Sequence, residues 1–192
     1  MKLSFKLFNK IHLKLLQILS TYLNLEKKAN FNRYLPFNEN LNDRWKKAKL
    51  FGFGDKSSVY DSCFVFGEVN VGIDCWIGPN TILDGSGGLT IGDFVTISAG
   101  CQIYSHDSII RTLSSNKKEI KIKKTVIGNN VYLAPNCIVR KGVTIGDHCV
   151  VANGSYVNNN VEKNSIVAGN PARKIGEVLI QKGDIKLIYF TK

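Results

Sequence analysis

Residues 126–157 read VIGNNVYLAPNCIVRKGVTIGDHCVVANGSYV, and an aliphatic residue recurs in this stretch at every sixth position. A helix would place apolar residues three and four apart, and an amphipathic strand would place them two apart. Neither period explains a spacing of six, whereas a coil of short repeats does. The spacing runs through three series, which are Val59, Val65, Val71, Ile77 and Leu83; Ile91, Ile97 and Ile103; and Ile127, Leu133, Val139, Ile145, Val151 and Val157.

A second set of small residues lies two positions before each aliphatic residue. Residues two apart on a strand point to the same face, so both sets should face the interior. Gly, Asn and Asp fill the corners between them, where positive φ or side-chain hydrogen bonds make tight bends inexpensive. We therefore predict an all-β solenoid, and its second inward set is Cys63, Val69, Cys75, Thr81, Val95, Cys101, Val131, Cys137, Val143, Cys149, Ser155 and Val161.

All five cysteines fall in this small inward position. They therefore resemble compact core residues, which free cysteines often are. An odd count without any Cys-x-x-Cys spacing argues against disulfides, a zinc site or a redox site, and it fits a reducing compartment. We expect reduced, packed thiols and no metal.

Length and charge set broader bounds. The 192 residues suffice for one buried domain with appendages, and the net charge of +11 indicates an anionic partner. That partner class includes nucleic acid, a membrane surface and a phosphorylated small molecule. Many lysines lie in residues 1–50 and 117–124, outside the repeat, so charge does not decide between them. No recognised nucleic-acid motif accompanies the charge, and we predict no nucleic-acid partner.

Residues 1–55 form a separate helical, basic segment in this interpretation. The segment lacks a small-residue cleavage site and the ~20-residue apolar run that a membrane span needs, so we expect a cytoplasmic protein. Two interpretations of residues 1–28 stay open, which are packing on this domain or a neighbouring subunit, and peripheral contact with the inner face of an anionic membrane. The helical spacing is carried by Leu3, Leu7, Ile11, Leu15, Ile18, Leu19 and Tyr22, beside a stripe of Lys2, Lys6, Lys10 and Lys14.

Two breaks interrupt the period within the predicted coil of residues 56–172. From Leu83 to Ile91 is eight residues with three glycines between, which indicates a bulge that absorbs two extra residues. Residues 107–124 lose the pattern altogether, and we predict a loop that leaves the coil there. Loops on rigid scaffolds often carry binding and catalysis. Residues 173–192 are expected to form a short C-terminal tail.

His106 lies at the base of that loop, after Ser105. A six-residue repeat broken by a loop that opens with a Ser-His step resembles the left-handed parallel β-helix acyltransferases. Within them the chain is similar to the maltose/galactoside O-acetyltransferases and their polysaccharide O-acetyltransferase relatives. The resemblance covers roughly residues 59–175, and its most specific pieces are the Ser105-His106 step and residues 87–93, 126–133, 142–147 and 167–173.

The resemblance implies acetyl transfer from acetyl-CoA to a sugar hydroxyl, in homotrimers with active sites between subunits. His106 would be the general base, because an imidazole can both accept and return a proton near neutral pH. His12 lies among the lysines of the N-terminal helix, and His148 occupies a corner position. The three histidines do not offer the spacing of a zinc site.

The family pattern also implies a CoA groove and an acceptor site. Gly176 stands where close relatives often carry a further basic residue, and Lys174 would substitute for it. The asparagines in these sets equally suit corner formation. Candidate CoA-binding residues are Pro135, Asn153, Gly154, Asn158, Asn159, Arg173 and Lys174, and candidate acceptor-binding residues are Asn80, Asp84 and Tyr104.

Residues 1–50 do not resemble the small N-terminal module of the maltose enzymes, which favours a cell-surface polysaccharide or its precursor as the acceptor. The alternatives are a xenobiotic or serine-type acetyltransferase of the same fold, and a non-catalytic trimeric scaffold that binds glycans.

Overall fold

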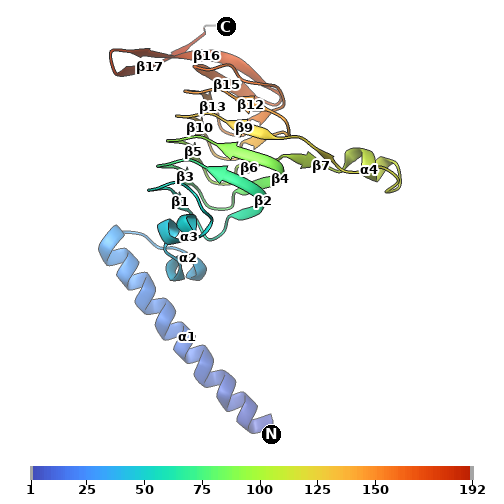
Figure 1. Ribbon diagram of the computed structural model, residues 1–192. Coiled ribbons are helices and arrows are strands. Elements are labelled where there is room, and N and C mark those ends of the chain that lie inside the picture. The colour runs from blue at the N-terminus through green and yellow to red at the C-terminus, as the bar shows by residue number, and fades with distance from the viewer. Residues whose placement is uncertain (1, 191–192) are drawn as a thin grey trace. The chain divides into compact units, whose positions relative to one another are not determined.

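The computed structural model describes the backbone of residues 2–190 and the side chains of residues 9–190. The chain divides after Asp43 into two compact units. The first unit is helical, and the second contains the repeats (Figure 1). No described helix is both long and apolar enough to cross a bilayer.

The first unit contains α1 (Lys2–Phe31) and α2 (Phe37–Leu41). Residues 2–35 contain neither Gly nor Pro, so nothing interrupts the helical backbone before Asn32 adopts a left-handed φ of 50°. α2 packs on α1, and Asn40 Nδ2 donates a hydrogen bond to Asn24 Oδ1 at 3.0 Å. The predicted amphipathic helix is therefore present and is followed by a short second helix.

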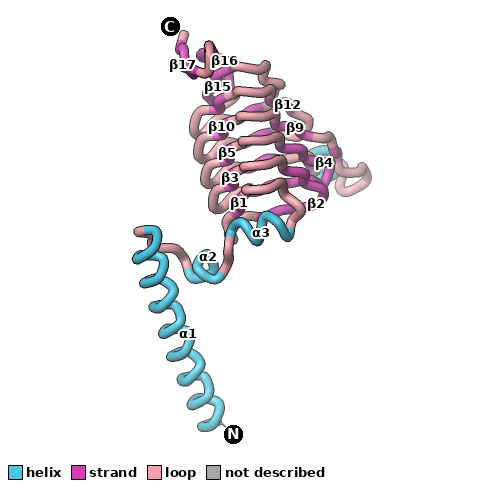
Figure 2. The backbone as a smooth tube through the Cα atoms, turned by 60° about the vertical axis from the view of Figure 1, so that its left-hand side comes forward, coloured by secondary structure: helices cyan, strands magenta, loops and turns pink. Residues whose placement is uncertain are grey.

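The second unit opens with α3 (Arg44–Leu50) and continues as a left-handed parallel β-helix, as the six-residue period predicts (Figure 2). Its strands stack into three flat faces. The first face consists of β1 (Ser58–Val59), β3 (Trp76–Ile77), β5 (Thr96–Ile97), β10 (Tyr132–Leu133), β13 (Val150–Val151) and β15 (Ser165–Gly169).

The other two faces share two long strands, β2 (Phe64–Val71) and β4 (Ile82–Ile91), which turn the corner between them. The second face is completed by β6 (Gln102–Ile103), β11 (Ile138–Val139) and β14 (Tyr156–Val157). The third face is completed by β9 (Thr125–Ile127), β12 (Thr144–Ile145) and the bridge of Val161 to Ile145.

Both inward sets line the interior of the coil as predicted. The aliphatic set is buried from Ile77 onward, and the small set is buried from Cys75 onward. Cys63 and Val65 are only partly buried, at the N-terminal end of the coil. Thiols of the small set hydrogen-bond to carbonyls of neighbouring rungs, for example Cys101 Sγ to Ala134 O at 3.1 Å. The cysteines therefore act as packed core residues.

The glycine-rich bulge is part of the ladder between β2 and β4. Gly67 pairs with Gly85 and Val69 with Leu89, so Glu68 opposes the three residues 86–88. A Cβ on Gly85 would lie 2.1 Å from the carbonyl oxygen of Glu68. Glycine is needed there because the two backbones approach too closely for any side chain.

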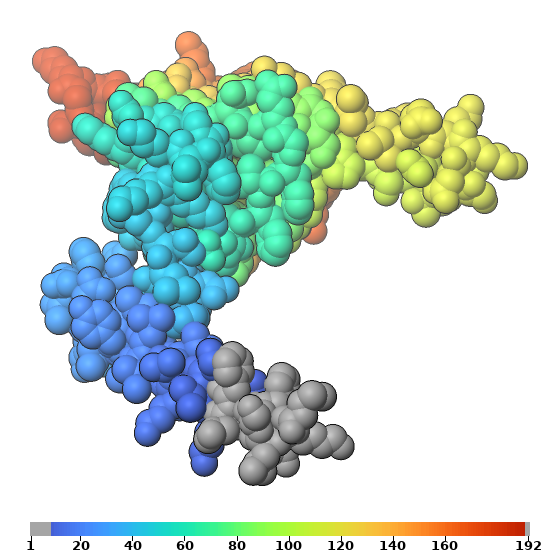
Figure 3. Space-filling model, turned by 60° about the horizontal axis from the view of Figure 1, so that its bottom comes forward, coloured from blue at the N-terminus to red at the C-terminus, as the bar shows by residue number. Residues whose placement is uncertain are grey.

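Residues 107–124 form an arm that projects from one edge of the coil (Figure 3). The arm is more ordered than a plain loop. It contains β7 (His106–Asp107), α4 (Ile109–Leu113) and β8 (Lys121–Ile122), and β7 pairs with β8 in antiparallel fashion.

The C-terminal segment is a hairpin instead of a simple tail. β16 (Ala172–Gln181) pairs with both β15 and β17 (Asp184–Tyr189) in antiparallel fashion. Lys182 and Gly183, with φ of 50° and 89°, form the turn that connects β16 to β17. The hairpin extends the sheet of the first face beyond the last rung.

Candidate active site

The arm leaves the coil at the edge between the second and third faces, and we call this edge the histidine edge. It is formed by the stacked corners of residues 84–88, 104–106, 140–142 and 158–160. Backbone hydrogen bonds join successive corners, from Tyr104 N to Val139 O at 3.0 Å and from Arg140 N to Val157 O at 2.9 Å. Residues far apart in sequence therefore lie above one another here.

His106 is paired with a buried carboxylate on this edge. Its Nδ1 lies 2.5 Å from Asp84 Oδ2, and the His106 side chain is 36% exposed whereas that of Asp84 is 2% exposed. Because an ionised carboxylate only accepts hydrogen bonds, this contact assigns the N–H to Nδ1 in the neutral ring. Nε2 is then the nitrogen with a lone pair for an incoming proton.

The carboxylate of Asp84 is held by several donors at once. Ser86 donates to Oδ1 through its backbone N–H at 3.0 Å and through its hydroxyl at 2.5 Å. The backbone N–H groups of Ser105 and His106 donate to Oδ2 at 2.9 Å and 3.2 Å. Burial alone would raise the pKa of Asp84, but these hydrogen bonds outweigh it and lower the pKa from 3.8 to about 2. Asp84 is therefore a fixed anion behind the imidazole.

The strand register explains why these two residues meet. Leu83 pairs with Ile103, so the coil that includes the bulge is 20 residues long. Asp84 consequently lies under the corner that leads to His106. Ser105, itself fully buried, fixes this corner because its Oγ accepts a hydrogen bond from Gly87 N at 2.7 Å.

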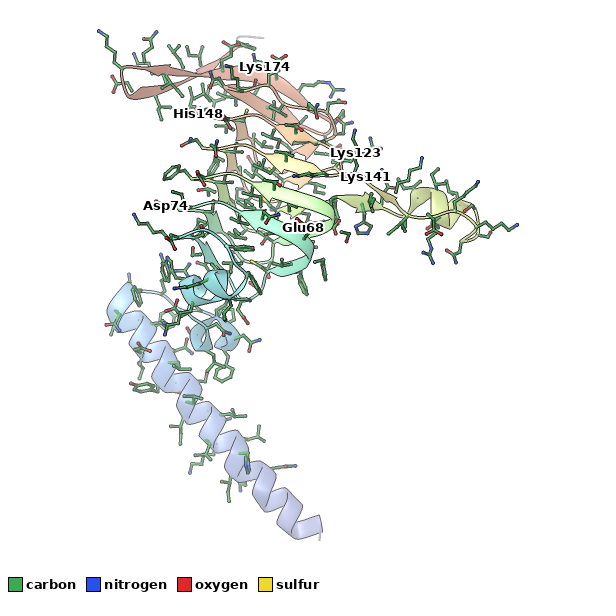
Figure 4. All side chains as sticks on the ribbon, viewed as in Figure 1. Glu68, Asp74, Lys123, Lys141, His148 and Lys174 are labelled. Atoms are coloured by element: carbon green, nitrogen blue, oxygen red, sulfur yellow. The ribbon has the colours of Figure 1, made fainter. Side chains whose placement is uncertain are left out.

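The base of the arm is fixed from the next rung. Thr125 Oγ1 donates to Tyr104 O at 2.7 Å, and Lys123 N donates to Ser105 O at 2.8 Å. Lys141 Nζ lies 3.0 Å from Asp107 Oδ2. Figure 4 shows Lys123 and Lys141 at the edge from which the arm leaves. The residues that precede and follow His106 in the chain are therefore held in place by these contacts.

The candidate acceptor residues lie in different places. Asp84 is turned toward His106 and is 1% exposed, so the structure does not support the predicted role of direct acceptor contact. Asn80 lies on the opposite edge of the second face, because it precedes the second-face part of β4, whereas Asp84 follows it. Tyr104 precedes Ser105 on the histidine edge, and its hydroxyl donates to Gln102 Oε1 at 2.8 Å.

A cavity of about 380 Å³ adjoins the histidine edge. It shares Ser86 with the Asp84 network and Ile122 with the strand paired to His106. Sequence reasoning missed this site, because its polar residues belong to three separate segments. Its polar side chains are those of Glu68, Asn70, Ser86, Thr90 and Lys124.

The candidate CoA residues fall into two groups, of which the first lies on the two edges of the second face and the second at the C-terminal end of the coil. Pro135, Asn153 and Gly154 stack on the edge between the first and second faces, where Gly154 N donates to Pro135 O at 2.9 Å. Asn158 belongs to the histidine edge and accepts a hydrogen bond from Asn159 Nδ2 at 3.0 Å.

The second group lines a cavity of about 310 Å³ at the C-terminal end of the coil, which contains Asn159, Arg173 and Lys174. Lys174 Nζ contacts Glu177 Oε1 at 2.6 Å, whereas the Arg173 side chain is exposed and donates only to the adjacent Ala172 O among the described contacts. Ser165 also lines this cavity, and its buried Oγ has no hydrogen-bond partner in the described structure. These groups suit a phosphate.

The other two histidines lie away from this edge. His148 occupies a corner between the third and first faces with a φ of 56°, and His12 is on α1. Within residues 9–190 no three His, Cys, Asp or Glu side chains converge as metal ligands.

Comparison with known families agrees with the repeat assignment. Residues 124–159 match the family described as bacterial transferase hexapeptide (six repeats), and residues 68–105 match the hexapeptide repeat of succinyl-transferase. The coil is therefore built from hexapeptide repeats of the kind that these transferase families contain.

Two curated proteins and one solved structure illustrate which proteins this chain is similar to. The galactoside O-acetyltransferase of Escherichia coli is 30% identical over 47% of this chain and 48% of its own length. The putative colanic acid biosynthesis acetyltransferase WcaF of the same species is 34% identical over 57% of this chain and 59% of its own length. A hexapeptide-repeat acetyltransferase from Vibrio cholerae, solved with acetyl coenzyme A, is 26% identical with a TM-score of 0.54, covering 86% of this chain and 88% of that one. The chain spans about half the length of the curated relatives it matches.

Proposed function

We propose that this protein is an acetyl-CoA-dependent O-acetyltransferase that acts on a sugar hydroxyl. The observation that carries the proposal is the pair formed by partly exposed His106 and buried Asp84 at the root of the arm. A base oriented by a fixed anion beside a cavity is the arrangement that activates a weak nucleophile.

In this mechanism the acceptor hydroxyl attacks the thioester carbonyl of acetyl-CoA while His106 Nε2 takes the hydroxyl proton. Asp84 keeps the N–H on Nδ1 and stabilises the imidazolium that forms. The tetrahedral oxyanion is stabilised by backbone N–H groups of a coil corner. When the C–S bond breaks, the imidazolium returns its proton to the CoA sulfur, and the products are the acetyl ester and CoA.

The donor would lie along the coil toward its C-terminal end. Arg173 and Lys174 provide cations, and Asn159 and Ser165 provide hydrogen-bonding groups in the same cavity. This combination supports phosphate binding there. Pro135, Asn153, Gly154 and Asn158 would contact the rest of CoA from the two edges of the second face.

The acceptor would enter the cavity of Glu68, Asn70, Ser86 and Lys124, which is also lined by Ile122, the residue paired with His106. Hydroxyl-rich sugars suit such a polar lining. The relative named for colanic acid biosynthesis supports a cell-surface polysaccharide or its precursor as the substrate class. We further propose that the protein is a homotrimer in which a neighbouring subunit completes each active site. We place it in the cytoplasm, where metabolism supplies acetyl-CoA.

A matched pair of substitutions tests the proposal. His106→Asn should lower the acceptor-dependent release of CoA thiol by ~10²-fold or more, while acetyl-CoA binding is retained. His148→Asn makes the same chemical change at a corner where asparagine suits the left-handed backbone, and it should leave turnover unchanged.

Turnover measured with a panel of acceptors distinguishes a sugar acetyltransferase from a serine or xenobiotic acetyltransferase. The panel contains glycans, serine and a xenobiotic amphenicol, with products identified by the mass of one added acetyl group. Turnover confined to serine or the xenobiotic would replace the sugar assignment. Equal turnover in wild type and His106→Asn would reject His106 as the base. If the wild-type protein shows no saturable binding of acetyl-CoA, a non-catalytic scaffold is favoured.

A further inference from the structure

Helix α1 carries a continuous apolar face. Its members follow one another at intervals of four, three, four and three residues, which places them on one side of a helix. Each is more than half exposed, although aliphatic and aromatic side chains are normally covered. The apolar face consists of Ile11, Leu15, Ile18, Tyr22 and Leu25.

The contact with α2 uses another side of α1. Asn24 bonds to Asn40 of α2, and Leu23, Asn24 and Lys27 are less exposed than the residues of the apolar face. Asn24 follows Tyr22 by two residues, which is about 200° around the helix axis. The first unit therefore packs on the side of α1 that contains Leu23, Asn24 and Lys27 and leaves the apolar face uncovered.

The charge of α1 distinguishes between possible occupants of that face. The chain has no acidic residue before Glu26, whereas Lys2, Lys6, Lys10 and Lys14 recur every four residues. Like charges at this spacing destabilise a helix by about 0.2–0.5 kcal/mol per pair. Packing α1 against a copy of itself would add six further lysines and only one acidic residue, Glu26. An anionic surface would instead neutralise the positive charge of this row of lysines.

We propose that α1 lies flat on an anionic lipid bilayer, with the apolar face in the interfacial region and Lys10 and Lys14 at the lipid headgroups. Lysine side chains can bury their methylene stems in this way while the ammonium stays in the polar layer. A basic helix with one apolar face and no capacity to span is the form that binds membrane surfaces. The inference does not depend on catalysis, so its test is separate from that of acetyl transfer.

Vesicle sedimentation of the full-length protein tests the proposal. We expect strong binding to vesicles of phosphatidylcholine with one-third phosphatidylglycerol, and at least ~10-fold weaker binding to phosphatidylcholine alone. Raising the salt from about 0.1 M to about 1 M shortens the Debye length from ~10 Å to ~3 Å and should weaken the anionic binding.

A matched pair of variants tests the face itself. Leu15→Glu removes a residue of the apolar face and should weaken vesicle binding by ~10-fold or more, the loss expected when a charge replaces a buried leucine. Leu13→Glu makes the same change about 200° away, at a side chain of similar exposure, 59% against 58%. It should weaken binding by no more than the ~2-fold to ~5-fold due to charge, about 1 kcal/mol per residue near the surface.

Three results would overturn the proposal. The first is absence of wild-type binding to anionic vesicles. The second is equal weakening by both variants, which would indicate general adsorption of a basic protein. The third is a fall in particle mass for Leu15→Glu in light scattering without vesicles, together with no lipid binding, which would assign the apolar face to a second copy of the chain.

Discussion

Lys141 Nζ lies 3.0 Å from Asp107 Oδ2, and both side chains are largely shielded from solvent, at 12% and 22% exposure. Lys141 belongs to the rung above, whereas Asp107 directly follows His106 in the arm. Burial alone would raise the pKa of Asp107, but the hydrogen bond and charge of Lys141 hold it below its usual value. The ion pair therefore attaches the first residue of the arm to the rigid coil.

We predict that Lys141→Met lowers kcat by about 10-fold, with KM for acetyl-CoA changed less than two-fold. Lys141 acts as a positioning residue, because a displaced arm would move His106 away from its productive position, and misplacement of about 1 Å can cost ~10²-fold. Lys141→Arg retains the charge and should restore most of the rate. A rise in KM alone, or no rescue by arginine, would contradict the positioning role.

The low pKa of Asp84 predicts a specific pH dependence of stability. A folded-state pKa of about 2, below the ordinary 3.8, means that the native state favours the carboxylate. The stabilisation is therefore complete above about pH 5 and is lost as the pH falls toward about 2. The difference in free energy of unfolding between wild type and Asp84→Asn should be constant from pH 5 to 8 and shrink below pH 4. Urea titrations at each pH measure it, and a difference that grows on acidification would contradict the prediction.

The sequence was sufficient to predict the coil because a single spacing defines it. Once Ile127 and Leu133 are known to face inward, the positions of strands and corners follow for every rung, since each rung repeats the same backbone path. The positions of the bulge and of the arm followed as well, because each interrupts the count at identifiable residues such as Gly85 and Asp107.

The partner of His106 could not be predicted in the same way. The 20-residue coil between Leu83 and Ile103 follows from the count, but the count does not show that the Asp84 carboxylate turns inward to Ser105 and His106 and not outward to an acceptor. The C-terminal hairpin has only a weak signal in the sequence. Apolar residues lie on both sides of Lys182-Gly183, but Lys-Gly is not one of the pairs typical of a two-residue turn.

The bulge provides a test of the link between fold and site. In Gly85→Ala the new Cβ would lie 2.1 Å from Glu68 O, so the ladder must separate, and we expect a loss of about 2 kcal/mol or more in the free energy of unfolding. Activity should fall too, because Asp84 directly precedes this position. Gly52→Ala is the matched control, since its Cβ would meet no atom within 4 Å and only its φ of 73° is strained, which costs about 1 kcal/mol. Similar losses in both variants would contradict the close-approach argument.

The reactivity of the cysteine thiols shows whether the coil stays closed in the native protein. Cys75, Cys101, Cys137 and Cys149 are buried, and only Cys63 is partly exposed, at the N-terminal end of the coil. Burial also raises the pKa of Cys75 and of Cys149, which lowers the fraction of reactive thiolate. In the native protein we therefore expect at most one thiol to react rapidly with an aromatic disulfide reagent, and all five to react in urea. Rapid labelling of two or more would mean that rungs separate under native conditions, and the labelled positions, mapped by peptide mass, would identify which part of the stack opens.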